Sequence, residues 1–176
     1  ARSILALLSK DRFDPVEAKL LEVLPPVKLA IRDSNRPPET FERDLAAAFD
    51  EQTRIAMLDF RKIRDDRSRW DALLSALGTR EQEITRQAAN RAASLMPADR
   101  PVSVTTSIAL TFGLPGRADH IVVLGEGAER LTVIDLARAL SEEEASAQAE
   151  QIEHLTRLFA ADAYQRAWTA YRAESP

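Results

Sequence analysis

The stretch Ser141–Ala173 reads SEEEASAQAEQIEHLTRLFAADAYQRAWTAYRA and carries the strongest helix pattern in the chain. Ser141 and Glu144 form a capping-box pattern, in which each side chain bonds a free backbone N–H of the first helical turn. Glycine and proline are absent from the stretch, so neither of the usual helix breakers interrupts it. The sequence therefore predicts a long C-terminal helix over about residues 142–173.

The two sides of this helix differ in polarity when successive residues are rotated by about 100°. The predicted core face contains Ile152, Leu155, Phe159, Ala163, Ala167 and Ala170. Tyr164, Trp168 and Tyr171 widen this face near the C-terminal end, and an aromatic stripe at helical spacing is typical of a core. The opposite, mostly polar side contains His154, Ala161, Asp162, Gln165, Thr169 and Arg172. That side is either a solvated helix face or the border of a cleft.

The rest of the chain predicts helices first and strands later. Residues 1–97 show repeated helical spacing, with Asp14-Pro15-Val16-Glu17 as a clear helix start. Apolar and polar residues then alternate from 102 to 112, as in a half-buried strand. Two short apolar runs follow, His120–Leu124 and Leu131–Leu136, both of strand length.

These patterns together predict an α+β fold that is mostly helical. A small antiparallel three-stranded sheet is expected over about residues 102–136, before the long C-terminal helix at about 142–173. The length of 176 residues favours a single domain over 1–176. Within it, we expect a helical part over 1–97 and the sheet plus the long helix over 98–176.

The composition excludes several classes of site. The chain has no cysteine and two histidines, so a thiolate zinc site, a disulfide, a cysteine nucleophile and a three-histidine metal site are all excluded within one copy. We therefore expect no metal and no cofactor. The net charge is −4, which gives no attraction to nucleic acid, and no apolar run approaches the ~20 residues of a membrane span.

Two further observations leave alternatives open. The basic segment Arg61–Arg69 is interrupted by two aspartates and has no alternating aromatic residues, which favours a solvated helix face over a nucleic-acid stripe. The chain begins at Ala1, which indicates processing or trimming. A removed signal peptide and a trimmed boundary both fit, so a cytoplasmic and an exported location both stay open.

Two small constellations of ionisable residues stand out. Arg117, Asp119 and His120 occur together at the start of the second predicted strand, where an Asp–His pair could orient an imidazole for base catalysis. A local turn network explains the same residues without catalysis. His154 follows Glu150 by one helical turn, and a surface ion pair accounts for that spacing.

The order of elements, and the segment Ala161–Gln165 (ADAYQ) in the last helix, resemble a group of uncharacterised bacterial proteins predicted to be zinc-dependent peptidases of the gluzincin kind. In those proteins the long helix carries His-Glu-x-x-His, where two imidazoles one turn apart bind zinc and the glutamate activates water. The resemblance covers about residues 80–176 and implies a zincin-like fold.

The same resemblance implies that the metal site is lost. Ala161 stands at the first histidine position, Asp162 at the glutamate and Gln165 at the second histidine. A methyl group cannot bind a metal, a glutamine amide is a poor zinc ligand, and no later helix supplies a third ligand. The resemblance therefore implies a degenerate, non-catalytic zincin-like domain without zinc, lacking catalytic residues.

The alternative interpretation is a helical interaction or scaffold module that is unrelated to peptidases. It follows from the long C-terminal helix and its aromatic end, through which a homodimer or a protein partner would be bound. Neither interpretation favours an enzyme, and a hydrolase that uses Asp162 or His120 is the third alternative.

Overall fold

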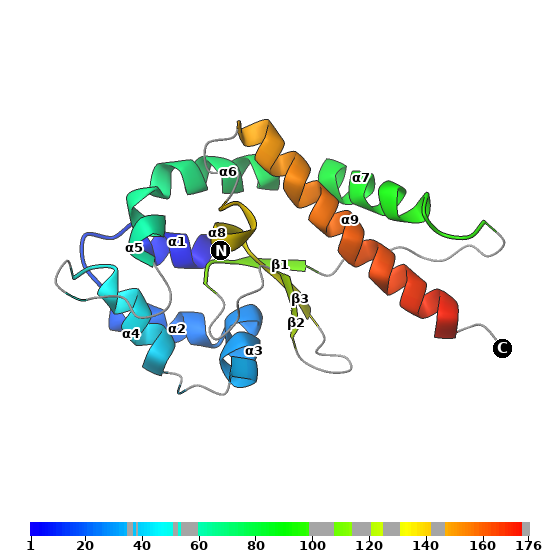
Figure 1. Ribbon diagram of the computed structural model, residues 1–176. Helices are drawn as coiled ribbons and strands as arrows, with labels where there is room; N and C mark the ends of the chain where they lie inside the picture. The colour runs from blue at the N-terminus through cyan, green and yellow to red at the C-terminus, as the bar shows by residue number, and fades with distance from the viewer. Residues whose placement is uncertain are drawn as a thin grey trace. The chain divides into compact units, whose positions relative to one another are not determined.

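The computed structural model describes residues 1–34, 37, 39–50, 53, 60–98, 108–113, 121–124, 131–141 and 147–173. These residues are mostly helical, with a small sheet and a long C-terminal helix, so the predicted α+β class is confirmed (Figure 1). The chain divides into two compact units. The first comprises residues 1–74 and 109–142, and the second comprises residues 75–108 and 143–176. The single domain over 1–176 stays a prediction.

The first unit contains most of the elements. Its helices are α1 (Arg2–Leu8), α2 (Pro15–Glu22), α3 (Pro25–Ser34), α4 (Glu39–Ala47), α5 (Phe60–Asp65), the first part of α6 (Arg67–Thr79) and α8 (Leu136–Ala139). Its strands are β1 (Ile108–Thr111), which begins at the boundary between the units, β2 (Ile121–Leu124) and β3 (Leu131–Asp135). The second unit contains the end of α6, α7 (Glu81–Ala93) and α9 (Gln148–Ala173).

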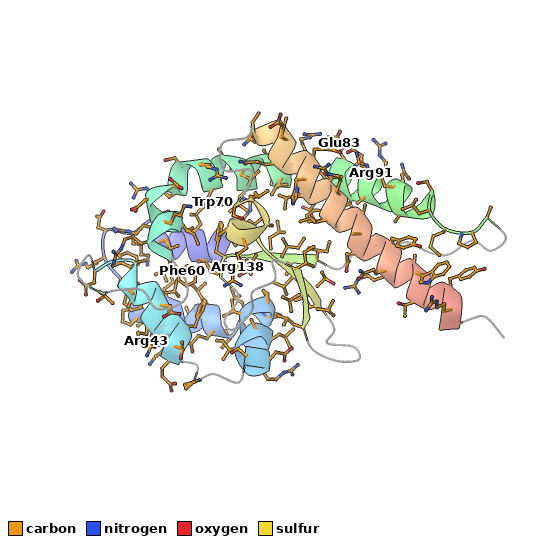
Figure 2. All side chains as sticks on the ribbon, in the orientation of Figure 1. Arg43, Phe60, Trp70, Glu83, Arg91 and Arg138 are labelled. Atoms are coloured by element: carbon orange, nitrogen blue, oxygen red, sulfur yellow. The ribbon has the colours of Figure 1, made fainter. Side chains whose placement is uncertain are left out.

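Short helices in the first unit are held by packing rather than by their own propensity. The seven-residue helix α1 buries Ile4, Leu5, Leu7 and Leu8. Edge-to-face aromatic pairs join elements of this unit: the ring centroids of Phe41 in α4 and Phe60 in α5 are 5.8 Å apart, and those of Trp70 in α6 and Phe112, just after β1, are 5.1 Å apart. Figure 2 shows Phe60 and Trp70 on the inner sides of α5 and α6.

The start of α2 is fixed by its cap, as predicted. The Asp14 carboxylate accepts hydrogen bonds from the backbone N–H groups of Val16 at 3.1 Å and Glu17 at 3.2 Å. Pro15 occupies the first helical position, where its missing N–H is not needed. The Glu17 side chain does not complete a capping box, because it pairs with Lys10 instead.

The sheet has the order β1-β3-β2 and is mixed, which corrects the expectation of an all-antiparallel sheet. β2 and β3 are antiparallel, with Ile121 opposite Ile134 and Leu124 opposite Leu131. β3 is the central strand, and β1 pairs with its other edge. Because β2 comes between β1 and β3 in the sequence, a tight hairpin cannot connect β1 to β3 and fix the direction of that pair. Residues 102–107 of the first predicted strand lie outside the described residues.

The sheet is packed against a helix of the same unit. Leu29 and Ala30 of α3 form a buried cluster with Val122, Leu124 and Val133. Every residue of β3 from Thr132 to Asp135 is buried, as expected of a central strand.

The chain after the sheet differs from the prediction in detail. β3 ends at Asp135, whose carboxylate accepts from the Ala137 N–H at 3.2 Å and caps the short helix α8. The Ser141 hydroxyl donates to the Arg138 carbonyl at 3.0 Å, so Ser141 contacts the end of α8 just after its C-cap Leu140, and it does not cap the long helix, which begins at Gln148. α9 is a long helix as predicted but begins at Gln148, and residues 142–146 lie outside the described residues.

Candidate interaction surface on the C-terminal helix

Helices α7 and α9 pack against each other in the second unit. α7 buries Ile84, Ala88 and Ala92, which recur every fourth residue. Four of the residues predicted for the core face of α9 are buried: Ile152, Leu155, Ala163 and Ala167. Phe159 is half-buried, and Ala170 is exposed, contrary to its predicted place in the core. An ion pair between Arg91 and Glu153 at 2.8 Å joins the two helices at their exposed edge.

The burial of α9 stops before the helix does. Ala167 is its last buried residue, and every residue from Trp168 to Ala173 is half-buried or exposed. The last turns of α9 therefore keep part of their surface open to solvent.

Those turns carry an ordered aromatic array, which consists of Tyr164, Trp168 and Tyr171. The rings of Tyr164 and Trp168 are stacked at 6.2 Å with an interplanar angle of 17°. Trp168 and Tyr171 are stacked at 5.4 Å with an angle of 11°. The Arg172 guanidinium lies 5.3 Å from the centroid of the Trp168 ring, within the range of a cation–π contact. All three rings are half-buried, so they are neither the predicted core nor a fully exposed patch.

The charged side chains of residues 163–173, the turns that carry the array, are all positive. Residues 163–173 contain Arg166 and Arg172 and no acidic residue. The Arg166 Nε lies 2.9 Å from an oxygen of Asp162, whose side chain is only 6% exposed, so Arg166 is neutralised by a buried carboxylate. Arg172 is exposed, and its guanidinium lies next to the Trp168 ring.

The predicted polar side of α9 is divided by the structure. Ala161, Gln165 and Thr169 are exposed, whereas His154 is half-buried. The Thr169 hydroxyl donates to the Gln165 carbonyl of its own helix at 2.8 Å. Asp162, which the helical wheel places beside this side, is buried, because Arg166 one turn later covers it. That this side borders a cleft stays a prediction.

The remaining sequence features concern the loop residues before β2, a metal site and a membrane span. Arg117, Asp119 and His120 fall outside the described residues. Across the part of the chain that is described, no group of three or more His, Cys, Asp or Glu side chains is placed to hold a metal. Among the described helices, none combines the length and the apolarity that crossing a membrane requires.

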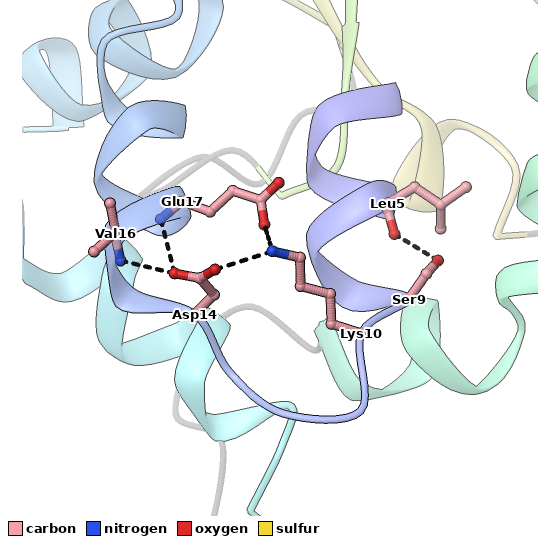
Figure 3. Close-up of polar contacts among 6 residues, drawn as sticks. All are labelled: Leu5, Ser9, Lys10, Asp14, Val16 and Glu17. Carbon is pink, nitrogen blue, oxygen red and sulfur yellow. Dashed lines mark hydrogen bonds and ion pairs between the residues drawn. The ribbon is translucent and has the colours of Figure 1, made fainter.

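A pocket of about 480 Å³ lies in the first unit and is lined by Ser9 to Pro15. Two of its charges are paired with each other, as Figure 3 shows: Lys10 contacts Asp14 at 3.0 Å, and it also contacts Glu17. Hydrogen bonds to Glu17 and Asp14 raise the pKa of Lys10, and the bond from Lys10 lowers the pKa of Asp14. One wall of this pocket is therefore formed by the cap of α2.

Comparison with known proteins adds no relative: no family model matches the chain, and neither does any curated protein or solved structure. The resemblance to gluzincins accordingly stays a prediction, and the aromatic array is the feature with the clearest physical consequence.

Proposed function

We propose that this chain is a helical protein-interaction module whose contact surface is the aromatic array of α9 together with Arg172. The observation that supports the proposal is the stacking of three half-buried rings beside an exposed guanidinium, in turns that contribute no buried residue after Ala167. Tryptophan, tyrosine and arginine are the residue types that contribute most to binding energy at protein interfaces.

The stacking favours a protein partner for a second reason. Rings that already rest on one another lose little conformational freedom when a partner covers them, which lowers the cost of binding. A nucleic-acid platform would instead need open ring faces on which bases can stack. The faces between Tyr164, Trp168 and Tyr171 are occupied by each other, and the net charge of −4 disfavours a phosphate backbone.

The charge of the surface specifies the class of partner. Arg172 is the exposed cation beside the rings, while Arg166 is compensated by Asp162. A partner segment with an apolar face for the rings and a carboxylate for Arg172 would match both features. We therefore propose an amphipathic, acidic helix as the partner segment.

Binding of a synthetic probe tests this proposal. The probe is a fluorescein-labelled amphipathic peptide with leucines on one face and glutamates beside them, and its matched control carries lysines in place of the glutamates. Fluorescence anisotropy should show that the glutamate peptide binds the chain more tightly than the lysine peptide.

Substitutions in the array locate the bound peptide. Trp168→Ala should weaken binding by about tenfold or more, because truncating an interface hot spot costs ~2 kcal/mol and ~1.4 kcal/mol is a factor of ten. Thr169→Ala, at an exposed neighbouring position, should leave the affinity unchanged. Equal binding by the Trp168→Ala variant, or preference for the lysine peptide, would show that the proposal is wrong.

A further inference from the structure

An exposed apolar stripe runs along α2, in the first unit. Val16 is 71% exposed, Leu20 is 62% exposed and Val23, just after the helix, is 67% exposed. Their spacing of four and three residues places them on one face, opposite the buried Ala18 and Leu21. This face of Val16, Leu20 and Val23 is called the α2 stripe. Figure 3 shows the Val16 side chain pointing away from α1.

The stripe is presented on a fixed support. The N-terminus of α2 is capped by Asp14, and Lys10 holds both Asp14 and Glu17 (Figure 3). Just before the cap, the Phe13 ring packs against Phe49 at 5.9 Å. Single exposed apolar residues are ordinary on protein surfaces, whereas several on one face of an anchored helix form a surface that a partner could cover.

The residues beside the stripe carry both signs of charge. On the helical wheel Lys19 and Glu22 lie on the same flank of the stripe, with Lys19 exposed and Glu22 half-buried. A uniformly acidic helix or an anionic lipid surface would be attracted by Lys19 and repelled by Glu22. The same flank of a second copy, running in the opposite direction, would place a carboxylate opposite Lys19 and an ammonium group opposite Glu22.

We propose that α2 pairs with α2 of a second copy, in an antiparallel arrangement about a two-fold axis. In such an interface residue i contacts residue j while j contacts i. Leu20 then meets Leu20 of the second copy, and Val16 meets Val23. Because equal flanks face each other in an antiparallel pair, Lys19 of each copy lies opposite Glu22 of the other.

The surroundings of Glu22 support this pairing. Burial and the neighbouring carboxylates of Glu42 and Glu39 raise the pKa of Glu22, and Lys19 of its own chain offsets this in part. An ammonium group from a second copy would compensate the remaining repulsion. The α2 interface thus provides Glu22 with a cation as well as covering the stripe.

Sedimentation velocity of the full chain over a range of concentrations tests the proposal. The wild type should show a monomer–dimer equilibrium, and Leu20→Ala should weaken the dimer by about tenfold or more, as expected for a central interface residue. Leu95→Ala removes a leucine that is 67% exposed outside α2 and should change nothing. Trp168→Ala should also leave the dimer intact, which separates this interface from the array on α9.

A charge swap provides the decisive comparison. Lys19→Glu and Glu22→Lys should each weaken the dimer, and the double variant should restore it, because the two charges again face opposite partners. Circular dichroism verifies that each variant is folded.

Three outcomes would overturn the proposal: a strict monomer at every concentration, a dimer insensitive to Leu20→Ala, or a double variant as weak as the single ones. A monomer that binds vesicles of anionic phospholipid would assign the stripe to a membrane instead, and would also overturn it.

Discussion

Replacing Asp162 or Arg166 should destabilise the second unit by unequal amounts. Both side chains lie on α9, with the Arg166 Nε 2.9 Å from the Asp162 Oδ2. Asp162 is only 6% exposed, whereas Arg166 is 26% exposed. Loss of the arginine therefore leaves a buried carboxylate without its guanidinium, while loss of the aspartate leaves a guanidinium that water can reach.

The expected magnitudes follow from this difference in exposure. Removing one partner of a buried ion pair costs about 3–5 kcal/mol, which we expect for Arg166→Met, a change that keeps most of the side-chain stem. Asp162→Ala should cost less, about 1–3 kcal/mol, because the remaining donor is partly solvated. The double variant should lose about 0.5–3 kcal/mol less free energy of unfolding than the sum of the two single variants, since the two residues share one interaction.

Equilibrium unfolding in urea, followed by circular dichroism, measures these free energies. Arg157→Ala is the matched control, because Arg157 is an exposed arginine on the same helix and its loss should stay within about 0.5 kcal/mol. If Arg166→Met costs no more than Asp162→Ala, or if the two losses simply add, then Asp162 is not held by Arg166. Its burial would then need another explanation, such as the degenerate site that the gluzincin resemblance implies.

Three further predictions concern stability. Leu7 is fully buried in α1, so Leu7→Ala should cost about 2–5 kcal/mol in urea unfolding, and an unchanged midpoint would contradict the packing described. The pair Arg91–Glu153 is 43% and 48% exposed, so a double-mutant cycle should give less than about 1 kcal/mol, falling further with added salt. The hydrogen bond from Lys10 lowers the pKa of Asp14 in the folded chain. The Asp14 carboxylate should therefore contribute fully to the free energy of unfolding above its pKa in the unfolded chain, and this contribution should disappear as the pH falls through its lower pKa in the folded chain. Asp14→Ala should therefore flatten the acid limb of the stability profile, and an identical limb would refute this origin.

The elements with a clear period could be predicted from the sequence. The long helix ending at Ala173 follows from the spacing of Ile152, Leu155, Ala163 and Ala167, which the structure buries. The start of α2 follows from Asp14, because an aspartate just before a helix accepts hydrogen bonds from the free N–H groups of the first turn. Capping is a local interaction, so neighbouring residues suffice to reveal it.

Features that depend on distant neighbours could not be predicted in this way. The polar wheel position of Asp162 gives no hint of its burial, although an arginine at i+4 is a visible signal for the pair with Arg166. Ser141 matches a helix start by pattern but bonds the end of α8, because a capping box says nothing about the preceding helix. The order of the sheet depends on which strand lies in the centre, and no local pattern in β1 specifies that.

The exposure of the two candidate surfaces, on α9 and on α2, also depends on distant neighbours and could not be predicted from local patterns. The helical spacing of Tyr164, Trp168 and Tyr171 predicts a core position, yet all three are half-buried, because burial depends on neighbours that the spacing within one helix does not specify. On α2, the apolar residues Leu20 and Leu21 are adjacent, so they must point to different sides of the helix. That adjacency signals a second apolar side, but only the fold shows that it is exposed.

The central claim is that the aromatic array of α9 is covered by a partner segment, and acrylamide quenching of tryptophan fluorescence tests it most directly. Trp70 is 3% exposed and is shielded already, so the change in quenching reports on half-buried Trp168. We predict that the acidic amphipathic peptide protects Trp168 from quenching while the lysine peptide does not. Binding of the acidic peptide, seen by anisotropy, with no change in the quenching of Trp168 would contradict the claim.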